Sequence, residues 1–148
     1  MNIPIHKNRS WIAALHKGID QMDERTKAAI MRPAGIACAS DLLSLCEKYL
    51  EKKIESIEDL VTGWNIVRER RHLTDKWLLE GNSITGVFNE CGCPLVNSGL
   101  IELHPVQCYC SQGLMETIFS EVAARPVQVE IKRSIGRGDK VCEFSVKF

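Results

Sequence analysis

The sequence lacks an excess of charge of either sign, a long apolar run and an export signal. Its 19 Lys and Arg residues are balanced by 19 Asp and Glu residues, so no basic face is expected to hold nucleic-acid phosphates. No uninterrupted stretch reaches the roughly 20 apolar residues of a membrane-spanning helix, and residues 1–17 contain no apolar run of signal-peptide length. These absences predict a cytoplasmic protein with no nucleic-acid partner and no membrane partner.

The chain is long enough and apolar enough to form a core of its own. Its 148 residues are 45% apolar, which suffices for one ordinary domain. Helical periodicity prevails over residues 1–81, whereas residues 82–148 are expected to form a strand, a helix and a hairpin. Because strands that are segregated from helices form an antiparallel sheet, we predict a single α+β domain over residues 1–148.

Apolar residues at helical spacing predict several helices in the first half. Pro33 is expected to end a short second helix, and Ser56 begins a capping box that opens a later one. Trp11, Trp64 and Trp77 lie on helical stripes and are expected in the core. The helices are expected over residues 11–22, 23–31, 40–50, 57–67 and 73–79.

Strand periodicity replaces helical periodicity in the second half. Val127, Val129 and Ile131 alternate with polar residues, and the same alternation returns over residues 142–148 after a turn at residues 136–139, which predicts a hairpin. The other elements are a strand over residues 84–91, a loop over 92–107 with a short strand at 100–103, and an amphipathic helix from Ser111 to Arg125.

A local run of basic residues stands in the helical half. It consists of Arg68, Arg70, Arg71 and His72, and Glu69 lies among them. We therefore expect a solvated helix face, and an anion site is the alternative.

Seven cysteines are many for a chain of this length. Their odd number and the lack of an export signal favour reduced thiols over a disulfide framework. Two Cys-x-Cys pairs stand out, Cys91-Gly92-Cys93 and Cys108-Tyr109-Cys110. Because residues i and i+2 of an extended segment point to the same side, a loop that folds back would bring four thiolates into the tetrahedron of a structural zinc site. An iron–sulfur cluster uses the same ligands, and packing of small residues is the remaining alternative.

The other cysteines have simpler interpretations. Cys38 and Cys46 are expected to pack in the core from helices, and Cys142 is expected to point inward from the last strand. His104 is the histidine nearest to the two pairs. Since a Cys–His pair supports hydrolysis, Cys110 and His104 are candidate catalytic residues.

Five segments carry a resemblance to known families. They are Cys108-Tyr109-Cys110-Ser111-Gln112-Gly113, Arg125-Pro126-Val127, Gly138-Asp139-Lys140-Val141-Cys142-Glu143-Phe144, Cys91-Gly92-Cys93-Pro94 and Gly35-Ile36-Ala37-Cys38-Ala39. The first three resemble the end of 4-vinyl reductase-type small-molecule-binding domains and are similar to the C-terminal part of the L-2-amino-thiazoline-4-carboxylic acid hydrolase family. The last two resemble an uncharacterised cysteine-rich prokaryotic family grouped loosely with these.

The resemblance implies a fold of helices packed on an antiparallel sheet, related to the nitric-oxide-sensor and trafficking-complex ligand-binding domains. It also implies a pocket between the sheet and the helices for a small ligand. Cys142 matches the family cysteine of the last strand, and Cys142 and Phe144 are expected at that pocket.

Three functions remain open from the sequence. The first is a small-molecule-binding domain with a sensor or accessory role, which also holds zinc through Cys91, Cys93, Cys108 and Cys110. The second is a hydrolase of a small ring such as aminothiazoline carboxylate, with Cys110 as nucleophile or with a metal-activated water. The third is a structural or interaction protein whose cysteines only pack. Because the related folds often dimerise, a homodimer is an alternative to the monomer.

Overall fold

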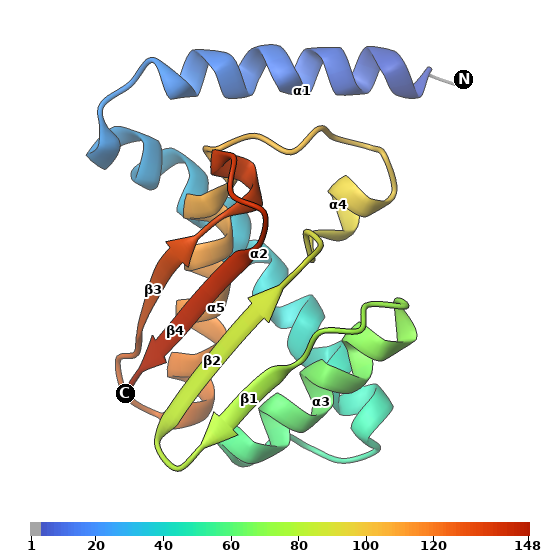
Figure 1. Ribbon diagram of the computed structural model, residues 1–148, viewed down its shortest axis with the longest axis vertical. Helices are drawn as coiled ribbons and strands as arrows, with labels where there is room; N and C mark the ends of the chain where they lie inside the picture. The colour runs from blue at the N-terminus through green and yellow to red at the C-terminus, as the bar shows by residue number, and fades with distance from the viewer. Residues whose placement is uncertain (1–3) are drawn as a thin grey trace.

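Helices come first along the chain, and the strands follow from residue 77 onward. The computed structural model describes residues 4–148, and Figure 1 shows how their elements are arranged. The helices are α1 (Ile5–Asp20), α2 (Glu24–Leu50), α3 (Ile57–Arg70), α4 (Pro94–Asn97) and α5 (Gln107–Ala123), with a short 3-10 helix η1 (Ile135–Arg137). The strands are β1 (Trp77–Glu80), β2 (Ser83–Phe88), β3 (Gln128–Arg133) and β4 (Cys142–Lys147).

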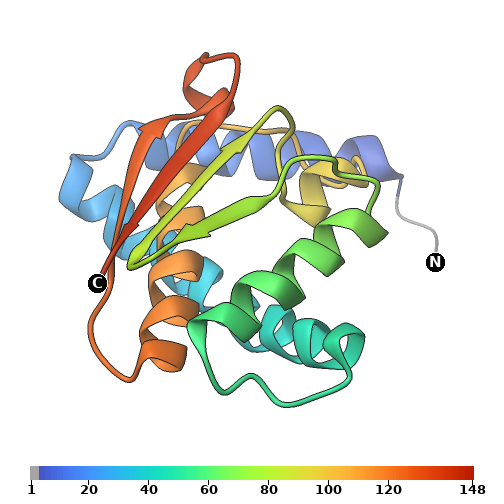
Figure 2. The same cartoon turned by 60° about the horizontal axis from the view of Figure 1, so that its bottom comes forward.

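The strands form one antiparallel sheet in the order β1-β2-β4-β3. Ile84 pairs with Val146 and Phe88 with Cys142, so the inward-facing residues of neighbouring strands lie side by side. Figures 1 and 2 show α2, α3 and α5 together on one face of this sheet. The core fills the space between them and consists of Leu60, Val61, Trp77, Ile84, Phe88, Met115, Ile118, Phe119, Val127, Val129 and Val146.

The α+β fold predicted from the sequence is confirmed. The hairpin is present as β3 and β4, in which Val129 faces Val146 and Ile131 faces Phe144. The capping box is also present, because the Ser56 hydroxyl accepts a hydrogen bond from the Asp59 N–H at 3.1 Å and α3 begins at the next residue. Local patterns that bury one face or satisfy a helix end were therefore reliable.

The expectation that Pro33 ends a helix is wrong. Helix α2 begins after Asp23, whose carboxylate accepts from the Thr26 N–H at 2.9 Å, and continues through Pro33 to Leu50. Proline removes one backbone donor to the carbonyl four residues earlier, here that of Ala29. Both Ala29 and Pro33 are exposed, so water can satisfy that carbonyl and the helix can continue.

Two glycines let α2 and α5 approach each other closely. A Cβ placed on Gly35 would overlap the backbone carbonyl of Cys110, and one on Gly113 would lie 2.8 Å from the Arg32 carbonyl oxygen. Beside this crossing, Arg32 Nη1 lies 3.1 Å from Glu116 Oε1. Because no side chain separates the two backbones, the crossing fixes how the first half of the chain sits on the second half.

Three further boundaries differ from those expected. Residues 77–80 form β1 instead of a helix, because the Asn65 side chain binds the Trp77 N–H at 2.8 Å and its carbonyl at 2.9 Å while the other edge of the strand pairs with β2. The region expected as a short strand at 100–103 has no strand, and α4 forms before it. Helix α5 begins at Gln107, one turn earlier than Ser111.

Helix α2 is the one helix among residues 4–148 that is long and apolar enough to span a membrane by length and composition. An 18-residue window in it has a mean hydropathy of 1.3, and 22% of that window is buried. Pro33 divides this segment in the sequence, which hides its length. In the fold, α2 packs on α5 and α3, and its buried residues are Met31, Gly35, Ala39 and Cys46.

The close crossing predicts opposite effects for two Gly→Ala changes on helices. Gly35→Ala should lower the free energy of unfolding by about 2 kcal/mol, because the new methyl group forces α2 and α5 apart. Gly18→Ala in α1 is the matched control, since nothing lies within 4 Å of its Cβ position, and it should be neutral or stabilising by up to about 1 kcal/mol. Urea unfolding measures both, and equal stabilities for the two variants would contradict the crossing.

Candidate functional site

The second Cys-x-Cys pair lies on a helix and not on an extended segment. Because α5 begins at Gln107, Cys108 and Cys110 are two helical positions apart, which turns their side chains about 200° from each other. Cys108 is buried, and its Sγ lies 2.9 Å from the Ser134 hydroxyl. Cys110 lies at the crossing with α2, where its backbone contacts Gly35. The two sulfurs of this pair therefore face different surroundings.

We call three neighbouring cysteines the inner thiol group, namely Cys91, Cys108 and Cys142. The Ile135 N–H donates to Cys142 Sγ at 3.4 Å, beside the Ser134 hydroxyl that binds Cys108. Burial raises the pKa of the Cys91 thiol, and the charges of Cys93, Cys142 and Cys108 act in the same direction, whereas a hydrogen bond from the Cys93 backbone lowers it. Burial also raises the pKa of Cys142, with Cys108 among the further causes. The three thiols come from the loop after β2, the start of α5 and the start of β4.

We call three other cysteines the outer thiol group, namely Cys38, Cys93 and Cys110. Burial raises the pKa of Cys110 to about 11, and the neighbouring thiolates of Cys38 and Cys93 contribute to that shift. Burial, followed by the charge of Cys93, also raises the pKa of Cys38. Cys38 is exposed, so its expected place in the core is wrong. Cys46 is fully buried as expected, and burial raises its pKa to about 12.

The zinc role of Cys91, Cys93, Cys108 and Cys110 stays a prediction. Cys91 and Cys108 belong to the inner thiol group and Cys110 to the outer one, whereas the charge of Cys93 acts on both Cys91 and Cys110. Among residues 4–148, no three His, Cys, Asp or Glu side chains are arranged to hold a metal ion. Both pairs are expected on extended segments, where residues i and i+2 point to the same side. Cys108 and Cys110 lie on helix α5 instead, so their side chains point in different directions.

The two candidate catalytic residues have different neighbours. His104 Nδ1 accepts a hydrogen bond from the Val106 N–H at 3.3 Å, and its ring faces that of His16 with the centroids 5.6 Å apart. Cys110 instead lies with Cys38 and Cys93. No described hydrogen bond joins Cys110 to His104, so their catalytic role stays a prediction.

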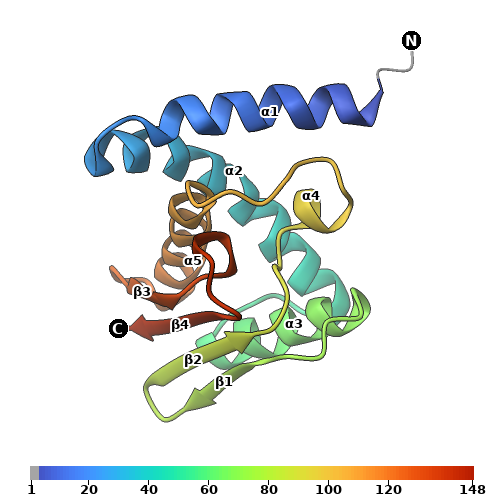
Figure 3. The ribbon, with the colours of Figure 1, turned by 45° about the horizontal axis from the view of Figure 1, so that its top comes forward.

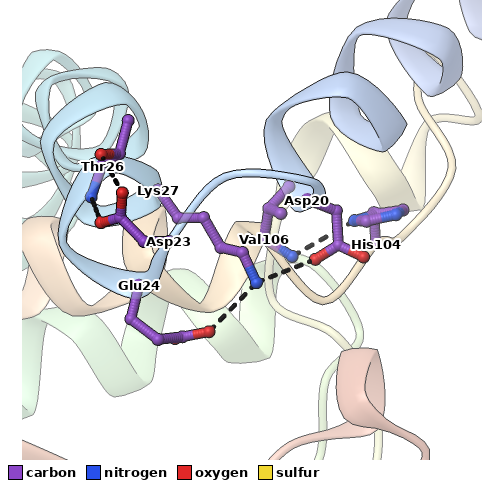
Figure 4. A network of polar contacts seen from close by, with 7 residues as sticks. All are labelled: Asp20, Asp23, Glu24, Thr26, Lys27, His104 and Val106. Carbon is purple, nitrogen blue, oxygen red and sulfur yellow. Dashed lines mark hydrogen bonds and ion pairs between the residues drawn. The ribbon is translucent and has the colours of Figure 1, made fainter.

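Helix α1 passes over the start of α5 and the loop before it, as Figure 3 shows. Its turn into α2 is held by Lys27, which lies 3.3 Å from Asp20 and 3.1 Å from Glu24 (Figure 4). His16 of α1 is buried, and burial, followed by the charge of His104, lowers its pKa.

Three apolar side chains of α1 are exposed, Ile5, Trp11 and Leu15, and Trp11 is 66% exposed. The expected place of Trp11 in the core is therefore wrong.

Arg68 is buried, although the sequence favoured a solvated helix face. It is 5% exposed, its Nε donates to the Asp75 carbonyl oxygen at 2.7 Å, and its Cζ lies 3.9 Å from the centre of the Phe88 ring. Its Nη2 has no hydrogen-bond partner among the described residues. The sequence contained a signal for this burial, because Arg68 follows Val61 and Trp64 at helical spacing on the inward stripe of α3.

An aromatic cluster surrounds the Phe88 ring and consists of Trp64, Trp77, Phe88, Phe119 and Phe144. The Trp77 ring stands edge-on to Phe88 with centroids 5.1 Å apart, and its buried Nε1 has no partner in the described part of the chain. Gly86 makes room for both rings, since a Cβ there would lie 2.5 Å from Phe88. The aromatic cluster thus contains one unpaired donor, Trp77 Nε1. Arg68 lies against it and provides a second unpaired donor, Nη2.

The two residues expected at a ligand pocket lie on this inward face of the sheet. Cys142 is the strand partner of Phe88, and the Phe144 ring lies 5.8 Å from Phe88 and 6.0 Å from Trp77. Their role stays a prediction. Two surface hollows lie elsewhere, one of about 490 Å³ between α5 and β3 and one of about 300 Å³ between the α1–α2 turn and the start of α5.

Comparisons with known proteins place the chain in a family. Residues 4–147 match the family described as a family of unknown function, DUF6144. The chain belongs to this family. None of the curated proteins compared with the chain matches it.

Two solved structures resemble the DUF6144 chain in fold. One is a crystal structure of the phenol-responsive sensory domain of the transcription activator PoxR with phenol, which has 14% identity and a TM-score of 0.59, over 99% of this chain and 75% of that one. The other is a trafficking protein particle complex subunit 3 from Naegleria fowleri covalently bound to palmitic acid, with 12% identity and a TM-score of 0.54, over 97% and 93%. At these identities the likeness establishes the fold alone.

These comparisons bear on part of the resemblance seen in the sequence. The expected relation to trafficking-complex folds agrees with the second structure. The likeness to 4-vinyl reductase-type domains and to the thiazoline hydrolase family stays a prediction, because the DUF6144 match alone identifies the family.

The thiol environments predict a clear order of chemical modification. Cys38 should react with a soluble thiol reagent at pH 8 in the folded protein, whereas Cys46 should not, because its burial restricts access and its raised pKa lowers the thiolate fraction by about a thousandfold. Mass spectrometry after timed alkylation locates the label. Unfolding in urea is the control and should expose all seven thiols, and equal labelling of Cys46 and Cys38 in the folded protein would contradict the structure.

Proposed function

We propose that this chain is a small-molecule-binding domain with a sensor or accessory role, and that its ligand binds at the aromatic cluster. The observation that carries the proposal is the pair of buried, unpaired donors, Trp77 Nε1 and Arg68 Nη2, whose side chains both pack against the Phe88 ring. Buried polar atoms in folded proteins are almost always hydrogen-bonded. An oxygen atom of a bound molecule would supply the missing acceptor.

The energetics favour such an occupant. A buried donor without a partner destabilises the folded state by about 1–3 kcal/mol, and a hydroxyl, carbonyl or carboxyl oxygen at that position recovers this free energy on binding. The rings of the aromatic cluster favour a flat or apolar ligand body through stacking and burial. The irregular segment 89–93 borders the site, since Gly92 lies against Arg68, and its displacement would open a way in.

The fold gives independent support. The two similar structures described above are a sensory domain with phenol and a trafficking subunit covalently bound to palmitic acid. Both ligands combine an apolar body with oxygen atoms, which is the chemistry that the aromatic cluster and its two donors suit. The proposal for this chain rests on its own unpaired donors, and the two folds agree with it.

Binding of phenol to this protein tests the proposal. Isothermal titration calorimetry should show binding of phenol that weakens by about tenfold in Trp77→Phe, because that variant keeps a ring but loses the Nε1 donor. Trp64→Phe is the matched control, since Trp64 also packs in the aromatic cluster but is not among the buried donors without a partner. Failure of phenol to bind, or equal loss in both variants, would reject the site.

A second candidate function, zinc binding, is favoured by the grouping of six cysteines into the inner and outer thiol groups. The predicted set of Cys91, Cys93, Cys108 and Cys110 stays a prediction, and no three His, Cys, Asp or Glu side chains among residues 4–148 are arranged to hold a metal ion as they stand. We propose that zinc, if bound, draws together the inner thiol group, in which Ser134 and Ile135 already bind Cys108 and Cys142. Hydrolase chemistry at Cys110 and His104, an iron–sulfur cluster and the homodimer stay predictions.

Elemental analysis of protein purified without oxygen and without a metal-affinity tag tests the zinc proposal. Wild-type protein should contain about one zinc per chain. Cys108→Ser should lose the metal and Cys110→Ser should keep it, because only the first variant changes the inner thiol group. Loss of zinc from both variants would restore the four-cysteine site, and metal-free wild-type protein would reject zinc binding altogether.

A further inference from the structure

We infer that the ligand of the aromatic cluster carries a carboxylate and that Arg68 binds it. This inference rests on the proposed small-molecule site and names the chemical class of its ligand. It starts from a charged side chain that is only 5% exposed and that forms no ion pair within 4.0 Å in the described part of the chain.

The hydrogen bonds of Arg68 leave most of its guanidinium unused. Its Nε donates to the Asp75 carbonyl oxygen, which is a neutral acceptor, and Nη2 has no partner. No ion pair within 4.0 Å joins Arg68 to an acidic side chain of residues 4–148. A guanidinium is always charged and presents its donors as a planar fork that matches a carboxylate.

The nearest acidic groups do not serve as this partner. Asp75 faces Asn89, whose backbone N–H and side-chain amide donate to its carboxylate at 2.8 Å and 3.0 Å. The negative charges of Asp75 and, to a smaller extent, of Glu90 act on Arg68, but neither carboxylate forms an ion pair with it within 4.0 Å. Because a buried cation is costly unless it is paired and hydrogen-bonded, an anion that arrives from outside would stabilise Arg68 further.

The surroundings of Arg68 select a flat ligand. Its guanidinium lies over the face of Phe88 at 3.9 Å, so a planar carboxylate in the plane of the guanidinium would extend along the same aromatic wall. Gly92 borders the fork, and a Cβ at that position would lie 3.3 Å from Nη1. A ligand would reach the guanidinium when segment 89–93 moves aside, and Gly92 carries no side chain that would stand in its way. An aromatic monocarboxylate has the shape and the charge for this position.

Benzoate and benzamide test the inference, because they share one shape and differ in charge. In calorimetry with chelator present, benzoate should bind wild-type protein about tenfold more tightly than benzamide, since only benzoate provides the charge-assisted pair. Arg68→Gln should remove this preference, and Arg68→Lys should keep part of it. Arg70→Gln is the matched control, because Arg70 is exposed on the same helix and should retain the full preference.

Each result separates the inference from the proposed function. Binding of phenol together with equal affinities for benzoate and benzamide would overturn the carboxylate and keep the small-molecule site. Absence of binding by phenol, benzoate and benzamide would overturn both. If Arg68→Gln lowers zinc content and leaves the preference for benzoate intact, then Arg68 serves the thiols and the inference is wrong. The wild-type comparison decides whether the site prefers a carboxylate, and Arg68→Lys tests the role of Arg68 even if Arg68→Gln does not fold.

Discussion

The close crossing of α2 over α5 is the contact on which the rest of the structure depends. Gly35 and Gly113 let the two backbones meet without an intervening side chain, and α5 in turn packs on the sheet through Ile118 and Phe119. This contact sets the rotation of α5 about its axis. Cys110 is thereby turned to α2 and Cys108 to the hairpin, so the division of the cysteines into two thiol groups follows from the helix packing.

The parts of the fold that the sequence predicted correctly are those decided by local chemistry. Alternation over Val127, Val129 and Ile131 has one stable solution when one face must be buried, and Ser56 satisfies the start of α3 wherever that helix packs. The errors arose where distant contacts outweigh a local rule. Pro33 ends many helices, yet α2 continues because its neighbours hold it on both sides of the proline. Trp77 fits a helical stripe, yet Asn65 and β2 bind its backbone as a strand.

The sequence indicates several residues of the candidate site, but it does not indicate how all of their side chains are placed. Cys142 and Phe144 were expected to point inward, and they do. The partition of the Cys-x-Cys pairs depended on whether α5 starts at Gln107 or at Ser111, a difference of one turn that no periodicity resolves. Arg68 was assigned to a charged run by its neighbours in sequence, although its spacing from Val61 placed it on the buried stripe. A charged residue at a core position of a helix deserves weight as a signal of function.

The order of the strands has a consequence for how the domain is made. Strand β4 lies between β2 and β3, yet it is the last of the four to be synthesised. Until residues 142–147 are available, β2 and β3 have no common partner, and the inward faces that carry Phe88 and Val129 cannot close over α5. Helices α1 to α3 can form early from local contacts, whereas the sheet is completed in one late step that joins residues far apart in sequence. Formation of the aromatic cluster therefore coincides with completion of the sheet.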